Sequence, residues 1–430
     1  MFKKIIILLS LLGVLVLKGF ADDTLRVMQY NLLYYDKVVH DCNEENNGTD
    51  HKNTQLKVIF GEFMPDIFTV NEMNGSESSV NKILNDVFNA DGVSHYKRAN
   101  YTGDYIVNML YYNTRKLELH SQSTIPTMVS SIYERTTDVY KLYYKSEDLA
   151  QTNDTIFLTC IVAHLKAGSY YEDQQIRHDA TKMIMSHISN NNINGNVMMM
   201  GDFNVYNSSE DAFQEFVSSS ASLRFYDPVN KLGDWHDNPY YSDYHTQSTH
   251  TSSGNNCPSA GGMDDRFDFI LTSLPILNGS DGLKYIEDSY WAFGQDGNRL
   301  NQSLNSPTNN SLPSDVINAL YYMSDHLPVV LKLHVDANPA STADIHSDIN
   351  HNFRVTNPIN NHIKVWSDVS DPETMGLQIT NLLGNTIINE RVTFYPGDET
   401  KIDTSILKPG IYLLTLKNGN YSFSKRLIKS

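Results

Sequence analysis

Seven apolar, strand-like runs alternate with amphipathic segments between Thr24 and Val335, and this pattern most constrains the fold. One of the intervening segments, residues 173–189, carries apolar residues at helical spacing, as expected of a helix packed on a sheet. Alternation of this kind predicts a mixed α/β domain with a large sheet core. The runs are TLRVMQYNLLYY, DIFTVNEM, YIVNMLYYN, TIFLTCIVAHL, NVMMMGDFN, RFDFILTS and HLPVVLKLHV.

The fifth run ends in the sequence GDFN, which sets Asp202 and Asn204 two positions apart. In an extended chain, residues two apart point to the same side, so the carboxylate and the amide project together where the strand ends. Taken alone, GDFN would equally fit a turn, because Gly, Asp and Asn all favour turns. The other runs decide between these interpretations.

Polar residues stand at the start or at the carboxyl end of most of the other runs. Sheets that contain parallel strands place ligand crevices at the carboxyl ends of those strands, so we expect these side chains to meet. The residues are Asn31, Glu72, His164, Asp268, Asp325 and His326.

These residue types fit the hydrolysis of a phosphate ester by water. Oxygen ligands from Asn31, Glu72 and Asp325 suit Mg²⁺, with Mn²⁺ or Ca²⁺ as alternatives. His164 and His326 exchange protons near neutral pH, and a carboxylate such as Asp268 can orient one of them. Asn204 can donate to a phosphoryl oxygen as negative charge builds there.

In order and in wording, these segments resemble the endonuclease/exonuclease/phosphatase superfamily, over about Thr24 to Val335. The resemblance implies a four-layer α/β sandwich of the deoxyribonuclease I type. It also implies catalytic roles for His164, Asp202, Asn204, Asp268 and His326, and a metal site at Asn31, Glu72 and Asp325. Asp202 and His326 both remain eligible as the general base. Two positions depart from the family pattern, Asn71 for the usual Gln and Phe267 for the usual Ile, and neither removes a ligand.

The chain begins like an exported protein. Lys3 and Lys4 precede a thirteen-residue apolar run, and small residues follow it up to Ala21, which predicts a cleaved signal peptide over residues 1–21. The run is too short to serve as a membrane anchor, so we expect no stable membrane insertion. The formal charge of −17 becomes −20 when the three leader lysines are removed, so a phosphate-bearing substrate has to be attracted locally, most simply by a bound cation.

Three cysteines are too few for a disulfide framework. Cys160 lies within an apolar run and is expected to be a buried, reduced residue. Cys42 and Cys257 lie in Asn-rich loops of an exported chain, so one disulfide between them is allowed and the sequence leaves it open.

The composition changes after the polar linker predicted at residues 336–352. Short alternating strands punctuated by glycines predict a small all-β sandwich over residues 353–430. With NLLGN, LKPGIYLLTL and the ending Lys425–Ile428, this segment is similar to the C-terminal sorting domain of the type IX secretion system of Bacteroidota. The resemblance implies contact with that machinery, export to the cell surface or beyond, and removal of the tail. An accessory domain that binds carbohydrate is the alternative interpretation.

The leading hypothesis is therefore a secreted, metal-dependent nuclease formed by residues 22–335, which would hydrolyse DNA or RNA as a monomer. A sphingomyelinase-like or small-molecule phosphodiesterase or phosphatase is the alternative with the same chemistry. A catalytically dead binding module is disfavoured, because all the expected site residues are present. The sequence leaves open the choice between DNA and RNA, the choice between endo and exo action, and the number of metals.

Overall fold

The computed structural model describes residues 23–39, 41–103, 105–129, 134–146, 149, 155–218, 223–253, 257–336, 353–356, 359–367, 372–381, 385–395, 399–418 and 421–429. The predicted signal peptide lies outside these ranges, as does the predicted linker apart from Asp336. The chain falls into two compact units, with the boundary between Pro339 and Ala340.

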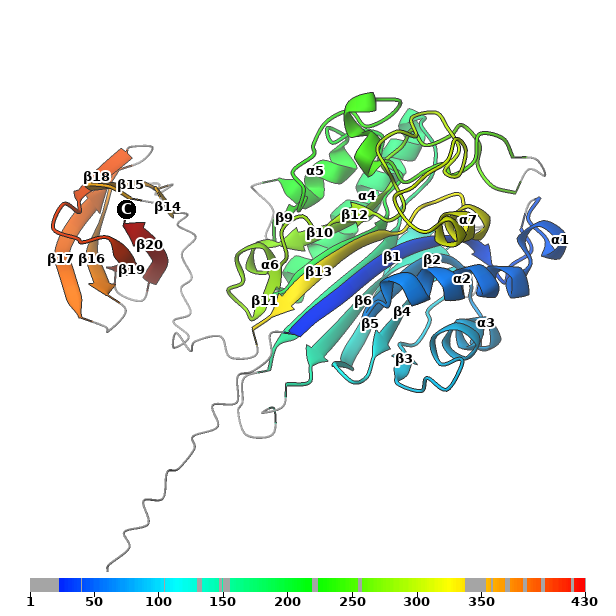
Figure 1. The fold of residues 1–430 in the computed structure, drawn as a ribbon, viewed down its shortest axis with the longest axis horizontal. Helices are drawn as coiled ribbons and strands as arrows, with labels where there is room; N and C mark the ends of the chain where they lie inside the picture. The colour runs from blue at the N-terminus through cyan, green and yellow to red at the C-terminus, as the bar shows by residue number, and fades with distance from the viewer. Residues whose placement is uncertain are drawn as a thin grey trace, which may run out of the picture. The chain divides into compact units, whose positions relative to one another are not determined.

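In the first unit, two mixed sheets pack face to face (Figure 1). One sheet has the strand order β11-β13-β1-β2-β4-β3, with β12 paired to β13, and the other has the order β5-β6-β7-β8-β10-β9. The first sheet comprises β1 (Asp23–Tyr35), β2 (Ile67–Asn74), β3 (Tyr96–Arg98), β4 (Ile106–Asn113), β11 (Leu283–Tyr285), β12 (Trp291–Ala292) and β13 (Val329–Val335). The second comprises β5 (Leu117–Val129), β6 (Glu134–Tyr144), β7 (Phe157–His164), β8 (Val197–Asp202), β9 (Phe225–Tyr226) and β10 (Asp268–Ser273).

Strand β8 shows why these runs are apolar throughout. Met198 and Met200 point into the core between the two sheets, whereas Val197 and Met199 point into the core beneath the helices on the other face. Because successive side chains of a strand alternate between faces, a strand covered on both sides needs apolar residues at every position.

Helices cover the outer face of each sheet and complete the predicted four layers (Figure 1). Helices α2 (Thr49–Phe63) and α7 (Ser314–Met323) pack on the first sheet, and α4 (Tyr171–Asn190) and α5 (Asp211–Val217) pack on the second. The shorter elements are α1 (Glu44–Asn47), α3 (Glu77–Lys82), α6 (Leu274–Asn278), the π-helix η1 (Ile83–Phe88) and the 3₁₀ helix η2 (Pro239–Tyr244).

The predicted helix over residues 173–189 is present as α4, but its buried face differs from the apolar spacing. Ile176 and Met183 are exposed, and Arg177 is fully buried instead. The Arg177 guanidinium donates to Glu210 Oε2 at 3.1 and 2.7 Å, so the buried charge is paired. An ion pair with a residue 33 positions away cannot be read from helical spacing.

The second unit is the predicted all-β sandwich. A three-stranded antiparallel sheet, β14-β15-β18, and a four-stranded antiparallel sheet, β17-β16-β19-β20, share one apolar core. The strands are β14 (Phe353–Val355), β15 (His362–Ser367), β16 (Glu373–Asn381), β17 (Thr386–Phe394), β18 (Glu399–Asp403), β19 (Gly410–Asn418) and β20 (Tyr421–Lys429). Among the described residues of both units, no helix combines the length and the apolar character needed to cross a membrane.

Candidate active site

Three of the predicted site residues lie side by side across the second sheet. Strand β8 pairs in parallel with β7 and antiparallel with β10, and the register sets Asp202 opposite both His164 and Asp268. Asp268 begins its strand, whereas the other two residues end theirs, so the antiparallel pairing brings all three to one edge. Register of this kind places side chains from distant parts of the chain next to one another.

The first sheet contributes Asn31 from β1 and Glu72 from β2. Asn31 Nδ2 donates to Asp202 Oδ2 at 3.0 Å and to Glu72 Oε1 at 3.2 Å, so its amide bridges the two sheets. Asn31 Oδ1 accepts from the backbone N–H of Leu33 at 3.0 Å. Because the amide nitrogen faces the carboxylates, Asn31 would offer its oxygen to a cation there only after the amide turned over.

His326 is held by the predicted carboxylate. Its Nδ1 lies 2.7 Å from Asp268 Oδ2, and its Nε2 lies 3.8 Å from Asp202 Oδ2. Burial alone would lower the pKa of the imidazole, but the attraction of Asp268 and Asp202 outweighs it and raises that pKa well above its usual value. The two carboxylates therefore favour the protonated form of His326.

His164 lies in the same site, but its surroundings shift its pKa in the opposite direction. Its Nε2 lies 3.5 Å from Glu72 Oε1 and 3.7 Å from Asp202 Oδ2. Burial, with Arg135 and His326 nearby, lowers the pKa of His164 well below its usual value. The surroundings of the two histidines thus shift their pKa values in opposite directions.

The carboxylates are crowded and mostly buried. Burial raises the pKa of Asp202 to about 7, with Asp268 and Glu72 adding to the effect, and burial with Asp325 raises the pKa of Glu72. Asp325 Oδ1 is buried and has no hydrogen-bond partner among the described residues. Buried, like-charged oxygens with free lone pairs fit a hard divalent cation, which would offset their repulsion.

The GDFN segment turns sharply after the strand. Gly201 has φ +136°, and a Cβ there would lie 1.8 Å from the carbonyl oxygen of Ala163, so only glycine fits. Asn204 has φ 52°, its N–H donates to Asp202 Oδ1 at 3.0 Å, and its Nδ2 donates to the carbonyl of Leu165 at 3.3 Å. GDFN thus forms the turn that its residue types favour, and because β8 ends at Asp202, the extended alternation predicted through Asn204 is wrong.

A chain of buried hydrogen bonds through two amides and one carboxylate holds the backbone at Asp202. The backbone N–H of Asp202 donates to Asn71 Oδ1 at 3.0 Å, Asn71 Nδ2 donates to Asn108 Oδ1 at 2.7 Å, and Asn108 Nδ2 donates to Asp138 Oδ2 at 3.1 Å. Asn71, one of the two departures from the family pattern, is therefore a link between the two sheets.

Gln247 belongs to the site and was missed from the sequence. Its Nε2 lies 2.7 Å from His326 Nε2 and 3.4 Å from Asp325 Oδ2, and its backbone bridges to His326 and to Asp265. A carboxamide has a donor end and an acceptor end, so by turning it can serve either protonation state of the ring. Gln247 lies in a long loop without periodicity, and no sequence signal marks it.

Arg135 on β6 was also missed. Its Nη1 donates to the carbonyl oxygens of Leu165 at 2.6 Å and His164 at 3.4 Å, and its charge acts on both Glu72 and His164. Strand β6 pairs with β7, which ends at His164, and only this pairing shows that Arg135 lies near the site.

A cleft of 510 Å³ adjoins Gln247. Its lining includes Tyr206, His236 and the carboxylates of Asp234, Asp264 and Asp265. Asp265 is buried, and its Oδ1 lies 2.8 Å from His236 Nδ1.

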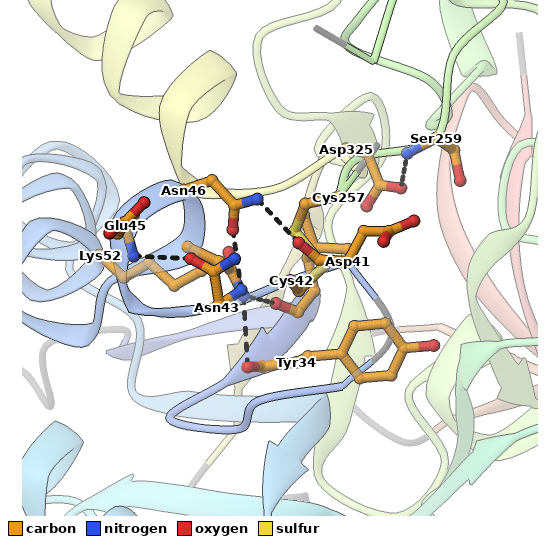
Figure 2. Close-up of a disulfide and its surroundings, with 12 residues drawn as sticks. Tyr34, Asp41, Cys42, Asn43, Glu45, Asn46, Lys52, Cys257, Ser259 and Asp325 are labelled. Carbon is orange, nitrogen blue, oxygen red and sulfur yellow. Dashed lines mark hydrogen bonds between the residues drawn. A yellow bond between two sulfur atoms is a disulfide. The ribbon is translucent and has the colours of Figure 1, made fainter. Parts of the chain in front are cut away.

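Other polar residues near the site have structural contacts. Lys166, two residues after His164, pairs with Asp173 at 2.9 Å, and His245 is buried with its Nε2 2.8 Å from the carbonyl oxygen of Trp235. Cys160 is buried and reduced, as expected, whereas Cys42 and Cys257 form a disulfide beside the site (Figure 2).

Residues 357–430 match the family model described as the secretion system C-terminal sorting domain, which confirms the resemblance of the tail. This domain marks the chain for export through the type IX system to the cell surface or the exterior. No curated protein matches the chain significantly.

Among solved structures, the chain is similar to the human Nocturnin catalytic domain with bound sulfate, at 15% identity and a TM-score of 0.44, covering 73% of this chain and 97% of that one. It is similar to D. rerio TDP2 complexed with a single-strand DNA product, at 13% identity and a TM-score of 0.47, covering 73% and 99%. It is also similar to an endonuclease/exonuclease/phosphatase from Bacteroides vulgatus, at 13% identity and a TM-score of 0.46, covering 73% and 99%. At this level of similarity, no activity of those proteins carries over to this chain.

Proposed function

We propose that the first unit is a divalent-metal-dependent phosphodiesterase that hydrolyses nucleic acid outside the cell. The observation that carries the proposal is the contact of 2.7 Å between Asp268 and His326, with Asp202 opposite Asp268 in the sheet and Glu72 nearby. A charged histidine beside crowded carboxylates suits the binding of phosphate and cation together.

Glu72 and Asp325 would hold the cation, joined by Asn31 once its amide oxygen faces inward. This assignment is supported by the unpartnered Asp325 Oδ1 and by the mutual repulsion of Asp325 and Glu72. When bound, a cation such as Mg²⁺ would neutralise charge on a phosphate oxygen and so favour attack by water.

The other side chains have separate roles in proton transfer and in stabilising the phosphoryl oxygens. Asp202, held by the N–H of Asn204, orients a water molecule and removes its proton. The carboxylates of Asp268 and Asp202 favour the protonated form of His326, so we assign this side chain to stabilise the phosphoryl oxygens and supply a proton, and we assign Asp202 rather than His326 as the general base. His164, as a neutral ring, and Asn204 each donate to a phosphoryl oxygen, and Arg135 adds positive charge on the same side.

The acidic cleft favours a second candidate function. Three carboxylates, those of Asp234, Asp264 and Asp265, line it next to Gln247, and they would repel further phosphates of a nucleic acid strand. A small phosphodiester with an uncharged or cationic leaving group fits this cleft better than a polyanion does.

The division of the chain belongs to the same proposal: a leader over residues 1–21, a catalytic unit over 22–335, a linker over 336–352 and a sorting unit over 353–430. The two compact units and the match over residues 357–430 support the last three parts. We further propose that the catalytic unit acts as a monomer.

The test is cleavage of supercoiled plasmid DNA and of single-stranded RNA by the purified protein with Mg²⁺, with Mn²⁺ and with excess chelator. We expect cleavage with either metal and none in chelator. His326→Ala should lose activity, whereas His178→Ala, a substitution at a partly exposed histidine on α4, should retain it.

Activity that persists in chelator would contradict the metal role, and equal activity of the two variants would contradict the site. If neither nucleic acid is cleaved while small phosphodiesters are hydrolysed in a His326-dependent reaction, the second candidate replaces the first.

A further inference from the structure

We propose that the Cys42–Cys257 disulfide positions Asp325, a ligand of the cation, and the bulge of β1 that follows Asn31, so that the site is complete only in the oxidised chain. The bond joins residues 215 positions apart (Figure 2). Both cysteines are buried in a small apolar cluster with Leu33. The inference rests on the proposed function, because it concerns Asp325 as a ligand. The disulfide reaches Asp325 through Ser259 and contacts the bulge of β1 through Leu33.

The first connection runs through Leu33. This residue packs against the disulfide, and its N–H donates to Asn31 Oδ1 at 3.0 Å. Leu33 and Tyr34 have φ values of 47° and 51°, a left-handed conformation that costs free energy in residues with side chains. The surrounding structure has to hold this bulge of β1, and the buried disulfide is part of what covers it.

The second connection runs through Ser259, two residues beyond Cys257. The N–H of Ser259 donates to Asp325 Oδ2 at 2.8 Å (Figure 2). This bond fixes one oxygen of the carboxylate and leaves Oδ1 without a hydrogen-bond partner among the described residues. Asp325 is thereby oriented with one oxygen held and the other available to a cation.

Cys42 provides a fixed point for both connections. Its N–H and C=O pair with the backbone of Val39 at 2.9 and 3.1 Å, and Asn43, the next residue, caps helix α1 by accepting from the N–H of Glu45 at 2.9 Å. Because these backbone hydrogen bonds fix Cys42, the disulfide also restricts the position of Cys257. The loop that contains Ser259 is therefore tied to the same rigid turn that abuts Leu33.

This arrangement makes the oxidation state of the chain matter for activity. Forming the bond takes one hydrogen from each thiol and passes two electrons and two protons to another disulfide by thiol–disulfide exchange. Thiols stay reduced in the cytosol and become oxidised in compartments outside it. Because the chain is exported, an enzyme that degrades phosphodiesters would gain its full cation affinity only after leaving the cytosol.

The experiment measures binding of Mn²⁺ alone to the full chain, without substrate, by the loss of the electron paramagnetic resonance signal of free Mn²⁺. We expect Cys42→Ser/Cys257→Ser, and wild type reduced and then freed of reductant, to bind Mn²⁺ about 10-fold more weakly than oxidised wild type. Cys160→Ser keeps the disulfide and should bind as wild type does. Asp325→Asn reports the loss of a ligand.

The outcomes separate the two proposals. Absence of Mn²⁺ binding by oxidised wild type would sink the proposed metal site itself. Equal binding by the oxidised and disulfide-free proteins, with weakened binding by Asp325→Asn, would overturn the positioning role alone. If the double variant fails to fold, Ser259→Pro decides, because it removes the N–H donor and keeps the disulfide; unchanged Mn²⁺ affinity in that variant would refute the connection to Asp325.

Discussion

One side of the candidate site is built on strands and the other on loops. His164, Asp202 and Asp268 are neighbours through β-sheet register. Gln247 and Asp325 lie outside the strands instead, and their side chains are held by a few hydrogen bonds, with a disulfide nearby. Moving a strand residue would require a shift of the whole sheet, but a loop residue moves when one contact is lost. The difference suggests that the strands fix proton transfer and that the loops set cation affinity and the fit of substrate.

The supporting layers differ in the same way. Asp202 rests on a chain of buried side chains that runs through Asn71 and Asn108 to Asp138 between the sheets. Gln247 instead borders an open cleft. Substitutions on the two sides should therefore have effects of different size and kind, and the following predictions test this.

The largest effect is expected for Asp202→Asn. Removing the proposed base should lower kcat by about 10³-fold. Stability should not fall, because the variant removes a buried carboxylate that already resists ionisation. The measurements are turnover and thermal unfolding, and a kcat within tenfold of wild type would exclude Asp202 as the base.

Asp325→Asn should act mainly on cation affinity. We expect the Mg²⁺ concentration for half-maximal activity to rise about 10- to 100-fold, with a smaller change in the rate at saturating metal. A titration of activity with Mg²⁺ separates the two quantities. A variant whose rate falls without any change in Mg²⁺ dependence would move Asp325 out of the metal site.

Gln247→Ala should have a moderate effect. It removes one hydrogen bond to His326, which corresponds to about 1.4 kcal/mol and a tenfold lower kcat/KM. The matched control is Gln214→Ala, a substitution at an exposed glutamine on α5 that should change nothing. If both variants behave alike, the contact between Gln247 and His326 has no role in the reaction.

Asp138→Asn should leave activity nearly unchanged and alter the pH dependence of stability. Burial raises the pKa of Asp138 to about 6, compared with about 4 in an unfolded chain, so the folded state binds this proton more tightly. The contribution to stability is therefore fully present below about pH 4 and is lost as the pH rises to about 6, a loss of about 3 kcal/mol.

Urea unfolding at intervals from pH 4 to pH 7 measures this effect. In Asp138→Asn, the free energy of unfolding should lack the loss that wild type shows as the pH rises from about 4 to about 6. Asp211→Asn, at an exposed carboxylate on α5, should follow wild type. Parallel curves for wild type and Asp138→Asn would show that Asp138 is already ionised in the folded protein at low pH.

Much of the strand-borne side could be predicted from the sequence. A polar residue at the end of an apolar run indicates a strand end, and Asp202, His164 and Asp268 each carry that signal. Gln247 and Arg135 carry no such signal. Gln247 lies in a loop without periodicity. Arg135 lies on β6, and the sequence does not show that β6 pairs with β7. The buried face of α4 was predicted in part only, because the ion pair between Arg177 and Glu210 depends on how α4 packs against the segment that contains Glu210.

The sequence by itself determined the α/β class, the sorting domain at the C-terminus and the residue types that meet at the sheet edge, because periodicity and motif are local properties. Only the tertiary structure decided in which direction the pKa of each histidine shifts, that Asn71 links the two sheets, and that Cys42 bonds to Cys257. These properties depend on distances between groups up to 215 positions apart, and no local pattern carries them.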